Sequence, residues 1–189
     1  MSLAADIQAL DERVLLVLRG VPVALLPFFR AVTFIGGGWG ILALLPFLVR
    51  RATRVITAWL LAAVAAQSAL VWILKNLVGR VRPCYALGWC APLVAPPQGP
   101  SFPSGHATGA FTFAAFVAVR APRWAAPALV WAALVAASRP VLGVHYPSDV
   151  ITGAILGSLV GVLFARAAPR VPPAPPPAAA GAATSAPAR

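Results

Sequence analysis

Residues 55–74 read VITAWLLAAVAAQSALVWIL and contain no charged side chain. Only Thr57, Gln67 and Ser68 interrupt this run with polar groups. At 1.5 Å per residue, a helix of about twenty residues extends about 30 Å, which is the thickness of the hydrocarbon core of a bilayer. The segment is therefore predicted to cross a membrane as a helix.

Further apolar segments surround this span at short intervals, at residues 36–49, 107–119, 124–137 and 148–165. They are apolar nearly all round and lack the 3.6-residue stripe that separates core from solvent in a soluble helix. Residues 14–35 are also apolar, but arginines and prolines interrupt them, so this segment either crosses the membrane or lies along its surface. The pattern predicts an all-α fold, a polytopic membrane helix bundle with five or six transmembrane helices.

The composition agrees with a single membrane domain. Of the 189 residues, 60% are hydrophobic and 10% are charged, whereas soluble domains carry about a quarter charged residues. We expect the membrane domain to occupy residues 1–166 and a Pro/Ala-rich, disordered cytoplasmic tail to occupy residues 167–189. The polar, acidic opening of the chain is unlike a cleavable signal peptide.

The arginines predict which ends of the helices face the cytoplasm. The formal net charge is +11, but the basic residues flank apolar segments and form no dense tract, which argues against a nucleic-acid partner. Basic loops at 50–54 and 120–123, and the tail from residue 166, are expected on the cytoplasmic side. The loops at 74–104 and 139–148 then face outside. We expect a multi-pass protein of the inner (plasma) membrane whose site faces the outside or the periplasm.

Three polar islands lie on this outer face and hold most of the reactive side chains. They are KNLVGRVRP at residues 75–83, PSGH at 103–106 and SRPVLGVHYPSD at 138–149. Lysine, arginine and histidine together indicate an anionic ligand of phosphate-like charge density. Asp149 is the one carboxylate after residue 12, and an ionisable group at the start of a membrane helix is a functional candidate.

The spacing K-x6-R-P, P-S-G-H and S-R-x5-H-x3-D resembles the three-part signature of the type 2 phosphatidic acid phosphatase family. The resemblance covers roughly residues 55–165 and implies a membrane phosphatase acting on a lipid phosphate. It implies that His145 attacks phosphorus and forms a phosphohistidine, that Asp149 holds the ring of His145, and that His106 is the general acid and base. It also implies a set of phosphate-binding residues: Lys75, Arg82, Ser104, Gly105 and Arg139.

Two of these islands leave alternatives open. Arg80 either belongs to the site or only extends its charge from a helix end toward water. Asp149 could also act simply as a negative charge at a helix N-terminus, a role compatible with orienting His145. Pro147 suits the first turn of a helix, which would place Asp149 just inside that helix.

The resemblance leaves the lipid open. We expect a polyprenyl diphosphate of the undecaprenyl type, with phosphatidate or phosphatidylglycerol phosphate as the alternative. A lipid phosphotransferase would share the first half-reaction, whereas a non-catalytic binder or transporter would not need an oriented His–Asp pair. Beyond residue 12 the chain has two histidines and one aspartate, too few ligands for a two-metal site, so neither a metal nor another cofactor is expected.

The sequence alone leaves several smaller features undecided. Cys84 and Cys90 either form a disulfide in the outer loop or remain free thiols. Residues 36–38 are three glycines that mark a helix break or close helix packing. The short segments beside the islands suggest a site recessed to the level of the lipid headgroups. The sequence does not indicate an oligomeric state.

Overall fold

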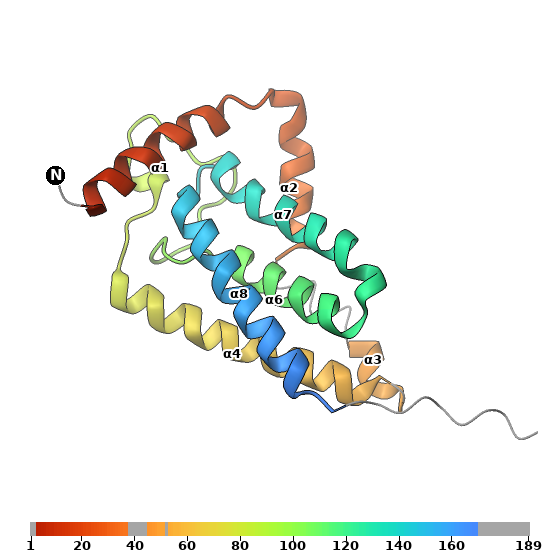
Figure 1. Cartoon of the computed structure of the whole chain (residues 1–189). Helices are drawn as coiled ribbons and strands as arrows, with labels where there is room; N and C mark the ends of the chain where they lie inside the picture. Colours follow the sequence, from red (N-terminus) through yellow and green to blue (C-terminus); the bar gives the residue numbers. More distant parts are fainter. Residues whose placement is uncertain (1–2, 38–44, 52, 170–189) are drawn as a thin grey trace, which may run out of the picture.

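A computed structural model describes residues 3–37, 45–51 and 53–169, and these residues form helices and no strand (Figure 1). The all-α prediction is therefore confirmed. In chain order the elements are α1 (Leu3–Arg19), η1 (Val23–Leu25), α2 (Leu26–Ile35), α3 (Leu45–Val49), α4 (Arg54–Val78), α5 (Pro83–Ala86), α6 (Gly105–Arg120), η3 (Pro122–Trp124), α7 (Ala125–Val141) and α8 (Pro147–Ala167).

Among the described residues, three helical segments are long and apolar enough to cross a membrane: Arg54–Ala86, Pro122–Val141 and Pro147–Ala167. They confirm the helices predicted at 55–74, 124–137 and 148–165. The helix predicted at 107–119 is α6, whose 16 residues make it shorter than these three. Residues 38–44 of the segment predicted at 36–49 lie outside the described residues, so the total of five or six spans stays a prediction.

The segment at 14–35 does not form one straight helix. It divides between α1 and the stretch Val23–Ile35, and the two are bent by 91°. The break falls at Gly20, Val21 and Pro22, where the glycine weakens a helix and the proline lacks the N–H that would continue it. As a result α1 lies across the ends of α7 and α8, while α2 crosses and packs against α7 (Figure 1).

Helices α6 and α8 form the closest pair in the bundle. Gly153, Gly157 and Gly161 recur every fourth residue on the face of α8 that meets α6. A Cβ added at Gly157 would lie 2.2 Å from the carbonyl oxygen of Thr108, and one at Gly161 would lie 2.4 Å from that of Thr112. Only glycine permits this approach, which is the small-residue packing common in membrane helices.

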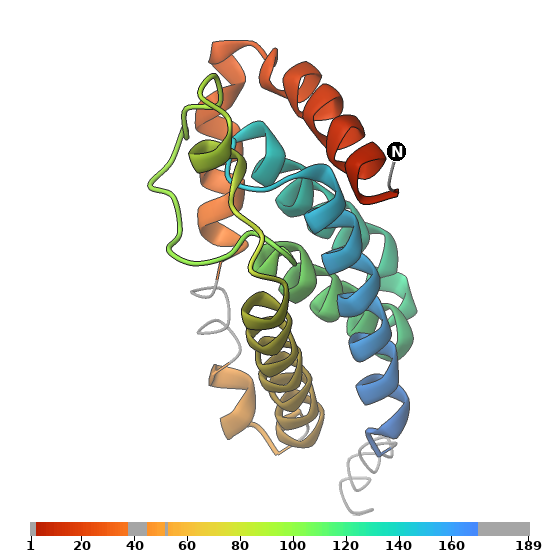
Figure 2. The ribbon, with the colours of Figure 1, turned by 90° about the vertical axis from the view of Figure 1, so that its left-hand side faces the viewer.

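Helix α4 completes the bundle by packing on this pair (Figure 2). Leu60 of α4 is buried in one cluster with Phe116 of α6 and Ala165 of α8. At the same end, Arg120 donates hydrogen bonds to the carbonyls of Ala168 and Pro169, at 3.0 and 2.8 Å. The C-terminal ends of α6 and α8 are therefore tied together where the basic residues lie, which leaves their N-terminal ends for the polar islands.

Two smaller features are also resolved in the described residues. A Cβ on Gly36 would lie 2.3 Å from Val135 Cγ2, so this glycine allows α2 to pack closely on α7. Cys84 and Cys90 are both free thiols, and Cys90 Sγ is 3.7 Å from the Gly143 carbonyl oxygen. The boundary expected at residue 166 and the tail stay predictions, because residues 170–189 lie outside the described part of the chain.

We predict that Gly157→Ala destabilises the protein by about 1–3 kcal/mol, because the new methyl group forces α6 and α8 apart. The melting temperature in detergent micelles measures the effect. Gly88→Ala is the matched control, since no atom outside the adjoining chain lies within 4 Å of a Cβ added there. Equal melting temperatures for the two variants would show that the close approach of α6 and α8 contributes nothing to stability.

Candidate active site

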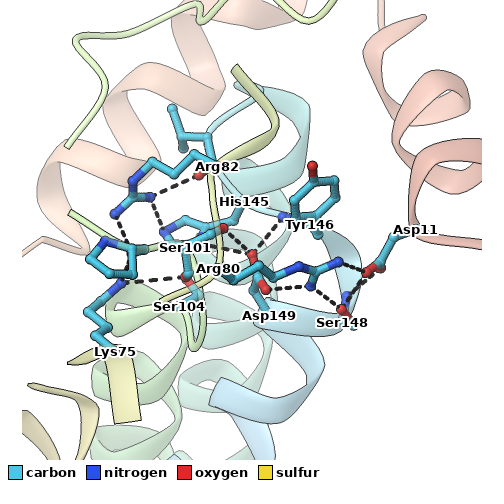
Figure 3. Close-up of polar contacts among 12 residues, drawn as sticks. Asp11, Lys75, Arg80, Arg82, Ser101, Ser104, His145, Tyr146, Ser148 and Asp149 are labelled. Atoms are coloured by element: carbon cyan, nitrogen blue, oxygen red, sulfur yellow. Dashed lines mark hydrogen bonds and ion pairs between the residues drawn. The ribbon is translucent and has the colours of Figure 1, made fainter. Parts of the chain in front are cut away.

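The three polar islands meet at one end of the bundle. The first spans the C-terminus of α4 and the start of α5, the second begins α6, and the third links α7 to α8. Figure 3 shows side chains from all three converging on the loop that carries His145. The imidazole of His145 is 2% exposed and lies between Asp149 on one side and Arg82 on the other.

Asp149 contacts His145 because α8 begins where the sequence predicted. The helix starts at Pro147, which puts Asp149 in its first turn. Asp149 Oδ2 is 3.5 Å from His145 Nδ1 and accepts a hydrogen bond of 2.9 Å from the backbone N–H of Tyr146. The Ser101 hydroxyl also donates to this oxygen. The carboxylate thus faces one nitrogen of the imidazole and is held there by its neighbours.

Arg82 contacts the other nitrogen of the same ring. Its Nη1 lies 3.0 Å from His145 Nε2 and donates a 2.9 Å hydrogen bond to the Val144 carbonyl. A guanidinium donates and never accepts, so Nε2 is the acceptor and the ring proton is on Nδ1, facing Asp149. The arrangement defines the tautomer of a neutral His145 with its free electron pair on Nε2.

Burial keeps this histidine uncharged. It lowers the pKa of His145 to about 3, because desolvation disfavours the imidazolium, and the nearby charges of Arg82 and Arg139 act in the same direction. The hydrogen bond to Asp149 opposes these effects and raises the pKa. The net result is a neutral imidazole at physiological pH, which is the nucleophilic form.

Lys75 and Arg82 both bind the backbone just before the second island. Lys75 Nζ donates to the carbonyl of Pro100 at 2.5 Å. Arg82 donates through Nε to the Gly99 carbonyl at 3.0 Å and through Nη2 to the Pro100 carbonyl at 3.1 Å. These bonds hold the two predicted phosphate-binding cations side by side next to His145 (Figure 3).

Arg139 and Ser104 carry polar atoms with no partner. Both side chains are buried, and among the described residues neither Arg139 Nε nor Ser104 Oγ makes a hydrogen bond. Arg139 is held from its other end, where Nη1 donates to the hydroxyl of Thr33 on α2. A buried polar atom without a partner is costly, so these two atoms are suited to an anionic ligand.

The remaining predicted residues lie at the start of α6. Ser104 is the N-cap, Gly105 is the first helical residue and His106 is the second. A Cβ built on Gly37 would lie 3.4 Å from His106 Nε2, so this ring faces the end of α2. All eight predicted residues are thus at one end of the bundle. Within the described residues, however, no hydrogen bond joins His106 to His145.

Arg80, whose role the sequence left open, belongs to the network around Asp149. Its Nη1 is 2.7 Å from Asp149 Oδ1 and its Nη2 is 2.7 Å from Asp11 Oδ2. The same nitrogens donate to Ser148 Oγ at 2.7 Å and to Gln8 Oε1 at 2.6 Å. It therefore does not act as a cation that only reaches toward water.

Sequence reasoning missed four contributors to the site: Gln8, Asp11, Thr33 and Ser101. The carboxylates of the first dozen residues were set aside, yet Asp11 is buried beside Arg80. The sequence holds one signal, because Leu15 follows Asp11 by one helical turn and the two share a face of a helix. In the structure that face is buried, since Leu15 has no exposed surface. No comparable signal marks Thr33 or Ser101, whose partners come from distant segments.

Comparison with known proteins places this architecture among related membrane enzymes. The model of the PAP2 superfamily matches residues 56–172. A decaprenylphosphoryl-5-phosphoribose phosphatase of Mycobacterium tuberculosis is 41% identical over 121 residues, which are 63% of this chain and 65% of that protein. A lipid A 1-phosphatase of Rhizobium johnstonii is 36% identical (52% and 42% covered), and an undecaprenyl-diphosphatase of Sulfolobus acidocaldarius is 32% identical (58% and 53% covered).

Solved structures show the same fold. Aquifex aeolicus LpxE aligns with a TM-score of 0.74 and 28% identity, over 83% of this chain and 95% of that one. The transmembrane PAP2-type phosphatidylglycerolphosphate phosphatase of Bacillus subtilis aligns with a TM-score of 0.71 and 28% identity, over 86% and 85%. The chain spans only 42–65% of the length of the three curated relatives.

We predict that His145 stays neutral between about pH 7.5 and pH 5, where an ordinary histidine with a pKa near 6.5 takes up a proton. Because its pKa is lowered, His145 takes up a proton only well below pH 5. The chain has two histidines, so His106→Asn leaves a single imidazole to observe. Its ¹⁵N resonances in micelles should not shift over this range, and a titration midpoint near 6.5 would contradict the assignment.

Proposed function

Because the chain belongs to the PAP2 superfamily, we propose that it is a membrane-embedded phosphatase that hydrolyses a phosphate or diphosphate monoester of a lipid. The observation that carries the proposal is the orientation of His145. Its ring is held with Nδ1 toward Asp149 and with Nε2 beside Arg82, a cation suited to phosphate. A histidine with a purely structural role would need neither Arg82 beside Nε2 nor the neighbouring buried polar atoms that lack a hydrogen-bond partner.

In the first step, Nε2 of His145 attacks phosphorus and forms a P–N bond while the bond from phosphorus to the leaving oxygen breaks. His106, which takes up a proton when the phosphate dianion binds beside it, gives that proton to the leaving oxygen. The ring of His145 becomes positively charged, and the adjacent Asp149 stabilises that charge. As the phosphoryl group reaches Nε2, the Arg82 N–H groups turn from the imidazole to the phosphoryl oxygens.

In the second step, water attacks the phosphohistidine. His106, now neutral, takes a proton from the water, the P–N bond breaks, and phosphate leaves with His145 restored. The charges of Lys75, Arg82 and Arg139 stabilise the additional negative charge of both transition states. Ser104 Oγ and the N–H of Gly105, at the start of α6, bind the remaining oxygens.

The substrate we propose is a polyprenyl diphosphate of the undecaprenyl type. The names of two relatives, a decaprenylphosphoryl-5-phosphoribose phosphatase and an undecaprenyl-diphosphatase, support this class. The 16 residues of α6 extend only about 24 Å, which supports a site recessed to the headgroups. Phosphatidylglycerol phosphate, phosphatidate and lipid A are the competing substrates, the first and last being suggested by other relatives.

We predict that the purified protein releases phosphate from undecaprenyl diphosphate faster than from the competing lipids or from a water-soluble phosphate ester. Turnover should persist in EDTA, since two histidines and one aspartate beyond residue 12 are too few ligands for a two-metal site. His145→Ala should lower kcat by about a thousandfold or more, because no phosphohistidine can form.

This assay distinguishes the proposed mechanism from its alternatives. Undiminished turnover by His145→Ala would disprove the covalent mechanism. Lipid binding without phosphate release would favour a binder or transporter, and transfer of phosphate to another lipid would favour a phosphotransferase. Equal rates on the soluble ester would argue against a recessed site, and loss of activity in EDTA restored by a divalent metal would argue against a metal-independent reaction.

We propose that the site faces the outside or the periplasm from the inner membrane. The end of the bundle opposite the site carries Arg120 and Arg166, as expected for a cytoplasmic end. A reporter active only in the cytoplasm, fused after Ala168, should be active, while one inserted after Gly88 should be silent. The reverse pattern would place the site in the cytoplasm.

A further inference from the structure

Helix α1 lies outside the region that the family model matches, yet it contributes a buried carboxylate to the site. The Asp11 side chain is 4% exposed. One turn later, Leu15 is fully buried in a cluster with Cys90 and Tyr146. Asp11 and Leu15 therefore form the face by which α1 docks on the loop that carries His145.

Two carboxylates share one guanidinium at this contact. Arg80 bonds Asp149 through Nη1 and Asp11 through Nη2, each at 2.7 Å. Its charged group also lies 4.0 Å from the centre of the Tyr146 ring. Asp11 accepts further hydrogen bonds from Ser148, from its N–H at 2.8 Å and from its hydroxyl at 2.5 Å. The cluster thus connects α1 directly to the first turn of α8.

The charge balance of this cluster matters for the reaction. Asp149 must remain negative to stabilise the positive ring that His145 acquires during attack. Arg80 alone would neutralise Asp149, because a buried Arg–Asp pair has no net charge. With Asp11 the three groups carry a net charge of −1, so Asp149 is both held in place and left electrostatically effective.

We propose that Asp11 and Arg80 are positioning residues for the reaction, acting through Asp149 on His145. The proposal rests on the phosphatase function proposed above. Asp11 would compensate the charge of Arg80, and Arg80 would fix the carboxylate of Asp149 with Oδ2 toward the imidazole. The N-terminal helix is then part of the catalytic apparatus, although the three motifs do not include it.

The position of the cluster predicts which kinetic constant depends on it. Figure 3 shows Arg80, Asp11 and Ser148 on one side of the His145–Asp149 pair, and Lys75 and Arg82 on the other. Because the cluster lies away from the phosphate-binding cations, losing its charge balance should weaken the attack by His145 and leave substrate binding unchanged. The expected signature is a lower kcat at constant KM.

Asp11→Asn is the principal test, with undecaprenyl diphosphate as substrate and rates normalised to the monodisperse, folded fraction. We expect kcat to fall about tenfold, with KM unchanged, because the Arg80 charge is no longer balanced. Asp6→Asn is the matched control, since it removes the same charge from an exposed position of the same helix and should keep the wild-type kcat.

The double variant Arg80→Gln/Asp11→Asn separates charge compensation from a purely structural role. Removing both charges leaves Asp149 negative, so the double variant should lose less than the product of the two single losses.

Three results would overturn the inference. They are a wild-type kcat in Asp11→Asn, a loss confined to KM, or single losses that multiply in the double variant. The wild-type chain separates this inference from the proposed function. A wild type without turnover overturns both, whereas an active wild type with an equally active Asp11→Asn variant overturns only the role of α1.

Discussion

The close approach of α6 and α8 is the constraint on which the site depends. Because Gly153, Gly157 and Gly161 have no side chains, the two backbones touch, and at their N-terminal ends Ser104 N–H donates to the Asp149 carbonyl at 3.0 Å. The second and third motifs are therefore joined by main-chain contact. Bulkier residues on α8 would move its first turn, and with it Asp149, away from the start of α6. The geometry of the candidate site therefore depends on how α6 and α8 pack in the middle of the bundle.

The site also separates its charges into two groups. Lys75, Arg82 and Arg139 are the cations to which the proposed mechanism assigns the phosphate, while the carboxylates of Asp149 and Asp11 lie behind the imidazole. His145 stands between the groups, neutral at rest, and its two nitrogens meet charges of opposite sign. This arrangement suits an attack in which negative charge grows at phosphorus and positive charge on the ring, because each develops beside fixed charge of the opposite sign.

Much of this could be predicted from the sequence, because motif spacing and apolar length are local properties. The long helices, the start of α8 at Pro147 and the gathering of eight site residues at one end all followed from such patterns. The contacts of Asp11, Thr33 and Ser101 did not, since each depends on how a distant segment docks. Asp11 reaches the site only because the chain bends by 91° after α1. A pattern of apolar residues does not predict such a bend. The glycines of α8, which recur every fourth residue, are a signal for close packing that is visible in the sequence.

The sharing of Arg80 by Asp11 and Asp149 has a consequence for biogenesis. The ribosome makes α1 before α4 and α4 before α8, so Asp11 and Arg80 have both been synthesised when Asp149 is still to be made. His145 and its carboxylate partner Asp149 arrive together in the last helical hairpin, and the cluster closes only when α8 inserts beside α6. A chain whose insertion stops earlier has cations but no oriented imidazole. Under the proposed mechanism such a chain cannot form the phosphohistidine, so we expect activity only from the closed bundle.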